Sequence, residues 1–139
     1  MSMFKIFDVA GSALNAQSVR LNTVASNMAN ANVAASSPEN TYRARMPVFQ
    51  TMLNQQMGGR NEGNPVQVAG IVESRREAIP EYSPGHPMAN EQGYIFKPDI
   101  SMPEEMANMM SASRSYQMNV EVMNTSQRLM MRTIRLGEN

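Results

Sequence analysis

The last third of the chain is a long stretch without a helix-breaking residue, and it limits most strongly what the chain can fold into. From Glu104 onward there is no Gly or Pro until Gly137. Ser101 and Glu104 have the spacing of a capping box, and Pro103 suits a first helical turn. Large apolar residues then recur at intervals of three and four, as on one face of an α-helix: Met106, Met109, Tyr116, Val120, Met123, Leu129, Met130 and Ile134. The sequence predicts a single helix over 103–139, about 50 Å long at ~1.5 Å per residue.

A helix of this length needs a partner surface. Ordering its backbone costs about 1–2 kcal/mol per residue. Burying a large apolar side chain returns about 1.5–3 kcal/mol, and only if another surface covers it. The identity of that surface therefore decides whether the helix is stable.

Residues 3–32 are a second helical candidate. Its apolar residues repeat every seven positions, as in a coiled-coil seam that Gln17 interrupts: Phe7, Leu14, Leu21 and Met28. The other faces carry small neutral side chains and few charges, whereas a solvent-exposed helix usually carries more. This composition favours contact with other chains; the alternative is that the two terminal helices pair only with each other.

The middle of the chain, 37–102, contains most of the prolines and is rich in turn signals. Alternating patterns predict strands at 41–50 and 66–75. Composition predicts a flexible loop at 58–65 and a turn-rich segment at 82–87, and 94–96 is a candidate for a third short strand. The predicted fold is therefore mainly α with a small β insert of two to four strands. It divides into an N-terminal helix (1–36), the β insert (37–102) and a C-terminal helix (103–139), with the two helices forming a coiled-coil-like pair.

Composition excludes several classes of function. The net charge is zero, with 12 basic and 12 acidic residues, so no basic surface for nucleic acid is expected. The chain has no cysteine and one histidine, His86, which lies in a turn; this set cannot form a zinc site of the usual kind. No nucleophile elbow or phosphate-binding glycine loop is present. We therefore expect neither an enzyme nor a bound cofactor or metal.

The methionines leave one alternative open. The chain has 15 of them, and thioethers such as those of Met106, Met109, Met110, Met130 and Met131 are ligands that suit Cu(I). Most lie on the apolar stripe of the predicted helix, where methionine packs as leucine does. Packing is thus the favoured interpretation, and a Met-rich periplasmic Cu(I) carrier the alternative.

The N-terminal residues lack the apolar core of a secretory signal peptide, and no apolar run approaches the ~20 residues of a membrane span. If the protein works outside the cytoplasm, we expect it to leave by a route that needs no cleavable signal.

Two sets of residues resemble a known family. The helix from Glu104 to Val122 closely resembles the last helix of bacterial flagellar rod proteins, and the N-terminal runs 8–14, 20–22 and 25–31 are similar to the signature shared by rod, hook and hook-associated proteins. In the insert, the segments 41–45, 82–90 and 93–94 add to the resemblance. Two residues depart from the family pattern: Met28, in the N-terminal signature, stands where the family usually has Leu, and Thr41 stands where it often has Gly. The residues that carry the signature are Ala25, Ser26, Asn27, Asn30, Ala31, Ser113, Arg114, Tyr116 and Asn119.

The resemblance implies a structural subunit of the proximal flagellar rod. Such subunits leave the cell through the flagellar type III export apparatus and polymerise helically with other rod proteins in the periplasm, next to the junction with the inner-membrane ring. Their terminal helices, disordered in the monomer, form a coiled-coil layer of the tube, which transmits motor torque and encloses an export channel. The remaining alternative is a type III-exported translocator built as a helical hairpin.

Overall fold

The computed structural model describes residues 3–51 and 64–137. The chain begins with a long helix, α1 (Met3–Asn30), and ends with another, α2 (Met102–Gly137). Between them in the sequence lies a middle segment of short elements. That segment comprises a 3-10 helix, η1 (Pro38–Asn40), and four strands: β1 (Arg45–Thr51), β2 (Val66–Glu73), β3 (Ile79–Tyr82) and β4 (Tyr94–Lys97). The predicted terminal helices and the small β middle are confirmed.

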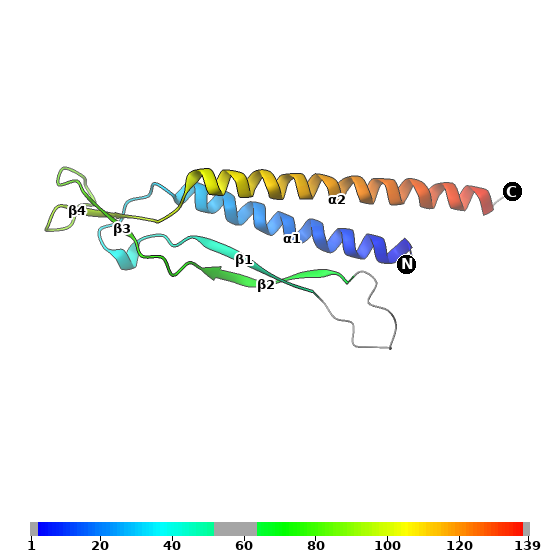
Figure 1. Cartoon of the computed structure of the whole chain (residues 1–139), viewed down its shortest axis with the longest axis horizontal. Coiled ribbons are helices and arrows are strands. Elements are labelled where there is room, and N and C mark those ends of the chain that lie inside the picture. Colours follow the sequence, from blue (N-terminus) through cyan, green and yellow to red (C-terminus); the bar gives the residue numbers. More distant parts are fainter. Residues whose placement is uncertain (1–2, 52–63, 138–139) are drawn as a thin grey trace.

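The molecule is elongated, and α1 is its central element. Figure 1 shows α1 and α2 side by side and antiparallel, with the β1–β2 hairpin along the other side of α1. The β3–β4 hairpin lies at the end where α1 finishes and α2 begins, and both ends of the chain lie at the opposite end of the molecule. Antiparallel pairing is consistent with a coiled coil, although that finer geometry stays a prediction.

The β1–β2 hairpin lies along α1 and contacts it through both strands. Its strands pair antiparallel from Arg45 opposite Glu73 to Thr51 opposite Val66, with a register shift after Val48. The predicted strand 66–75 is therefore correct within two residues, whereas the predicted start at Thr41 is wrong. Thr41 instead closes the 3-10 turn, because its hydroxyl donates to the Ser37 carbonyl at 2.9 Å. Most of the predicted loop 58–65 lies outside the described residues.

The β3–β4 hairpin was only half predicted. β4 covers the expected strand at 94–96, but β3 contains Pro80, which argues against a strand. Proline is tolerated because β3 is an edge strand: β4 pairs with β3 on one side and with Ala35 on the other. The predicted turn at 82–87 begins at Tyr82, the last residue of β3.

The core of the described residues consists of small side chains. The buried apolar residues are Ala10, Ala16, Val24, Ala31, Ala35, Ile95 and Ala112. Small side chains allow two helices to approach closely, since interaxial distance depends on the residues at the contact. They also leave little apolar surface buried, so many large side chains stay exposed along α2.

The start of α2 differs from the predicted capping box. The Glu105 N–H donates to the Ser101 carbonyl at 3.0 Å, which is the first bond of the helix. Among the described residues, neither the Ser101 hydroxyl nor the Glu104 carboxylate makes a capping bond. Glu105 is held by a contact with α1 instead.

Candidate functional site

Asn27, near the end of α1, is the centre of a network that connects three elements. Its side chain is 2% exposed. The amide nitrogen donates to the Arg45 carbonyl at 2.9 Å and to a carboxylate oxygen of Glu105 at 3.1 Å. The amide oxygen accepts from the Arg45 N–H at 2.9 Å and from the Tyr42 hydroxyl at 3.0 Å. The side chain thus uses both donor hydrogens and both lone pairs.

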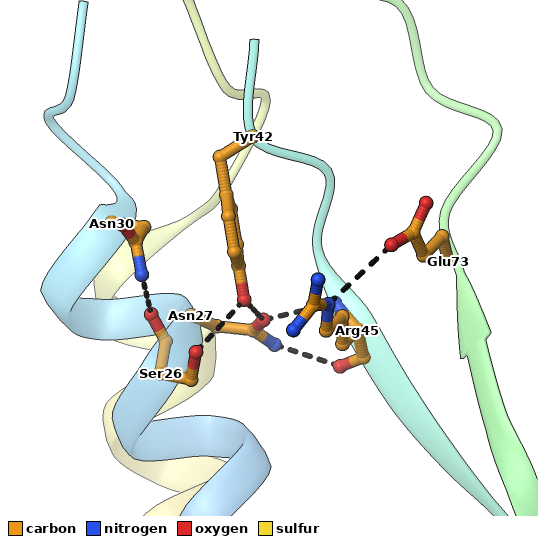
Figure 2. A network of polar contacts seen from close by, with 6 residues as sticks. All are labelled: Ser26, Asn27, Asn30, Tyr42, Arg45 and Glu73. Carbon is orange, nitrogen blue, oxygen red and sulfur yellow. Dashed lines mark hydrogen bonds and ion pairs between the residues drawn. The ribbon is translucent and has the colours of Figure 1, made fainter. Parts of the chain in front are cut away.

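Figure 2 shows how the neighbours of Asn27 complete this network. The Tyr42 hydroxyl lies 3.1 Å from the Ser26 hydroxyl. Because Tyr42 gives its only hydroxyl proton to Asn27, Ser26 is the donor in this second bond. Asn30 donates from its amide to the Ser26 carbonyl at 2.8 Å, one turn earlier in the helix. We call Ser26, Asn27, Tyr42, Arg45 and Glu105 the polar junction.

The polar junction fixes the position of β1 relative to the helices. Asn27 bonds to the N–H and carbonyl of Arg45, the first residue of β1, so it pairs with that strand as a backbone would. A buried polar group left without such a partner costs about 1–3 kcal/mol. The start of the hairpin therefore has one favoured position on α1.

Two weaker contacts surround the junction. The Arg45 guanidinium lies 3.4 Å from the Glu73 carboxylate across the hairpin, with about half of each side chain exposed. It also lies 5.6 Å from the centre of the Tyr42 ring. Exposed ion pairs contribute about 0–1 kcal/mol, and an exposed cation–π contact about 0.5–1 kcal/mol. They orient Arg45 more than they stabilise the fold.

Polar contacts also set the register of α1 against α2. The Arg20 guanidinium donates to the Asn108 side-chain oxygen at 3.2 Å, and Asn27 reaches Glu105 as described. Both contacts lie toward the end where the β3–β4 hairpin is found. Among the described residues, these are the side-chain hydrogen bonds that join the two helices. Near the start of α1 and the end of α2, the helices are therefore held together by packing.

The predicted seam residues are only partly buried in the structure. In α1, Phe7, Leu14, Leu21 and Met28 are half-buried. The fully buried residues of α2 are Ala112 and Ser126. The large side chains predicted for the α2 seam are half-buried or exposed: Met109, Val120, Met123 and Met130 are half-buried, and Met106, Tyr116 and Ile134 are 48%, 37% and 55% exposed. Their role as an assembly seam stays a prediction.

The signature residues divide into two groups. Ser26, Asn27 and Asn30 belong to or adjoin the polar junction, Ala31 is buried and Ala25 is exposed. On α2, Ser113 and Asn119 are half-buried, whereas Arg114 and Tyr116 are exposed. Sequence reasoning missed Glu105, Arg45 and Asn108 as partners, because nothing in a local pattern indicates contacts between residues 18 to 88 positions apart.

No group of three or more His, Asp or Glu side chains in 3–51 and 64–137 is placed to hold a metal ion. His86 accepts a bond from the Met88 N–H at 3.1 Å, which is a turn contact. No helix in this part of the chain combines the length and hydropathy that a transmembrane segment requires.

Comparison with known proteins identifies the class. Residues 7–34, within α1 and the turn after it, match the family model described as flagella basal body rod protein. Residues 91–136, from β4 through α2, match the model described as flagellar basal body rod FlgEFG protein C-terminal. The chain is therefore an axial protein of the flagellar basal body, and not an enzyme.

Full-length relatives narrow the class further. The chain is 46% identical over 138 residues to the flagellar basal-body rod protein FlgC of Escherichia coli O6:H1, covering 99% of this chain and all of the relative. Identity is 45% over 140 residues with FlgC of Salmonella typhimurium and 35% over 150 residues with FlgC of Bacillus subtilis, with the same coverage. The chain belongs to the FlgC family of flagellar basal-body rod proteins.

Proposed function

We propose that this protein is a structural subunit of the proximal flagellar rod, which assembles helically with other rod proteins. The observation that carries the proposal is the long helix pair with a large uncovered apolar surface, in a chain that matches FlgC over its full length. Along α2, Met110, Met118, Val122 and Leu136 are 68%, 57%, 47% and 79% exposed. Large exposed apolar patches mark sites of protein association.

In this proposal the helix pair forms the inner layer of a tube around the export channel, and the hairpins lie outside it. The subunit reaches the periplasm through the type III export apparatus without a cleavable signal, and it contacts other rod subunits and the junction protein of the inner-membrane ring. Torque transmission requires that a subunit move as one body. The polar junction supports this requirement because hydrogen bonds of the buried Asn27 side chain join α1, β1 and α2.

A charge in the α1 seam tests the proposal. Leu21 is half-buried on α1, and a Leu21→Asp substitution places an unpaired carboxylate there, which costs several kcal/mol when buried. We expect the variant to be exported and its β hairpins to stay folded. Flagellar assembly should nevertheless stop at a stage with the inner-membrane ring present and the rod and hook absent. Electron microscopy of isolated basal bodies and immunoblots of export fractions measure both outcomes.

The matched control is Asn15→Asp, which adds the same charge at an exposed position of α1. It should leave assembly intact. Complete basal bodies that contain the Leu21→Asp subunit would show that this face of α1 is not part of the assembly.

The Cu(I) and translocator alternatives are not favoured by the family assignment. For copper a direct test is available, because leucine has nearly the volume and apolarity of methionine but no thioether. We expect the triple substitution Met109→Leu, Met123→Leu and Met130→Leu to preserve rod assembly and swimming, and Met123→Asp to abolish both. If the leucine variant did not swim and added copper restored its swimming, copper binding would be favoured over packing as the role of these methionines.

A further inference from the structure

Methionine is concentrated in α2. Of the 15 methionines in the chain, this helix contains the following: Met102, Met106, Met109, Met110, Met118, Met123, Met130 and Met131. Some of them are well exposed to water: Met106 is 48%, Met110 68%, Met118 57% and Met131 51% exposed. We call these four residues the open methionines.

The other methionines of α2 are half-buried, and helix geometry explains the difference. Among the described residues α1 is the element on which α2 packs, and Ala112 is fully buried there at 0% exposure. With ~3.6 residues per turn, Met110 lies on the opposite side of the helix from Ala112. Met123 and Met130 come whole numbers of turns after Ala112, so they return to its side and are half-buried. The helix thus carries two sets of methionines that differ in access to water.

A thioether in contact with water is open to oxidation by peroxides. The sulfur takes one oxygen atom from hydrogen peroxide: the O–O bond breaks, an S–O bond forms, the sulfur loses two electrons and water is released. Methionine sulfoxide reductases reverse the change, because they oxidise two thiols to a disulfide and release the oxygen as water. The chain has no cysteine, so none of its own thiols competes with the thioethers for the oxidant.

Oxidation changes the surface on which the proposed function depends. Met110 and Met118 belong to the exposed apolar surface of α2, and a sulfoxide is polar where the thioether was apolar. In the free subunit the new oxygen stays hydrated, so the fold is retained. When a neighbouring subunit covers it, the oxygen loses water without gaining a partner, which is unfavourable. The periplasm, where assembly is proposed to occur, is an oxidising compartment.

We propose that the open methionines are a site of reversible oxidation by peroxides, accessible in the free subunit and closed to the oxidant in the rod. Oxidised subunits stay out of the rod until a reductase restores the thioethers. This inference rests on the proposed function and adds control by oxidation state to it. The methionines on the α1 side of the helix, Met123 and Met130, are oxidised slowly in both states.

Two tryptic peptides of α2 allow a comparison within one molecule. Cleavage after the arginines of the helix releases residues 115–128 and residues 129–132. Each peptide contains one open methionine and one methionine on the α1 side. The pairs are Met118 with Met123 and Met131 with Met130.

The first experiment treats the folded full-length protein with hydrogen peroxide and follows each methionine by tandem mass spectrometry. We expect the open methionine of each peptide to be oxidised about threefold or more faster than the other, since reaction follows exposure. In guanidinium chloride the two rates should be equal. In isolated basal bodies the open methionines should react about tenfold more slowly than in the free subunit, because neighbouring subunits cover them.

The second experiment tests exclusion from the rod in growing cells. Leucine keeps the apolarity of methionine and has no thioether. The variant replaces all of the open methionines: Met106→Leu, Met110→Leu, Met118→Leu and Met131→Leu. Each strain is its own reference, and basal bodies formed with hydrogen peroxide are counted against those formed without it. We expect this ratio to fall about twofold or more further in the wild type than in the leucine variant.

Two further variants serve as comparisons. The leucine triple variant at Met109, Met123 and Met130 keeps every open methionine, so its ratio should fall as in the wild type. Glutamine has about the length and polarity of methionine sulfoxide. We therefore expect a subunit with glutamine at all four open positions to be exported but absent from basal bodies, even without peroxide.

The outcomes separate this inference from the proposed function. Equal oxidation rates within each peptide of the folded protein overturn the assignment of the sites. Equal peroxide ratios in the wild type and the leucine variant, or normal incorporation of the glutamine variant, overturn the exclusion of oxidised subunits. If basal bodies contain the wild-type subunit in those cases, the proposed function stands. If they lack it without any peroxide, the proposed function fails, and the peptide rates still decide where the chain is oxidised.

Discussion

Asn27 uses every hydrogen-bonding group of its side chain, and its partners belong to elements far apart in the sequence. The amide matches this environment and its closest analogues do not. Aspartate has the same shape but loses both donor hydrogens, and its charge would face Glu105. Leucine would leave the Arg45 backbone unpaired. The structure therefore gives a physical reason for asparagine at this position of the signature.

An Asn27→Ala substitution should lower the free energy of unfolding by ~2–4 kcal/mol, because the buried Asn27 side chain makes four hydrogen bonds that the variant loses. Urea unfolding followed by circular dichroism measures the change. Asn22→Ala, exposed on the same helix, is the control and should change stability by less than ~0.5 kcal/mol. Equal stabilities of the two variants would mean that the junction does not hold the hairpin.

The two helices differ in stability along their length, since polar contacts join them at one end and small-residue packing alone joins them at the other. Local opening is easiest where few contacts hold a segment. Residues 20–30 and 102–112 surround the polar contacts, whereas the last residues of α2 extend past the described start of α1 (Figure 1). The expected disorder of the terminal helices in the monomer should therefore begin at the chain ends.

Amide hydrogen exchange of the isolated subunit should be slowest in 20–30 and 102–112 and fastest in 128–137, with the first turns of α1 in between. Mass spectrometry of peptic peptides resolves these segments. Limited proteolysis should likewise cleave residues 128–137 first. Uniform protection along both helices would show that the pair is a self-contained hairpin with no need of a neighbour.

Sequence patterns predicted the elements that periodicity defines and missed those that depend on distant contacts. The C-terminal helix follows from a spacing of three and four and the N-terminal helix from a seven-residue repeat, and β1 and β2 follow from alternation. β3 was missed because Pro80 is acceptable only at a sheet edge, which no local pattern reveals. Asn27 was recognised through its family signature, but its partners Tyr42, Arg45 and Glu105 are brought to it by the fold.

Taken whole, the molecule is a thin stack of α2, α1 and the β1–β2 hairpin (Figure 1). Its buried apolar residues are mostly alanines, and its exposed ones include many of the largest side chains. A monomer built this way buries little apolar surface of its own, while its neighbours in an assembly can bury more. This distribution supports the proposed rod function.

Both chain ends lie at one end of the molecule, and the polar junction lies at the other (Figure 1). Pulling the two termini apart would therefore peel α2 from α1 one contact at a time, as in unzipping, and would reach the buried hydrogen bonds last. Little force is needed for such stepwise opening, because no large set of contacts must break at the same time. A transport machine that draws in one terminus would meet the same low resistance over most of each helix.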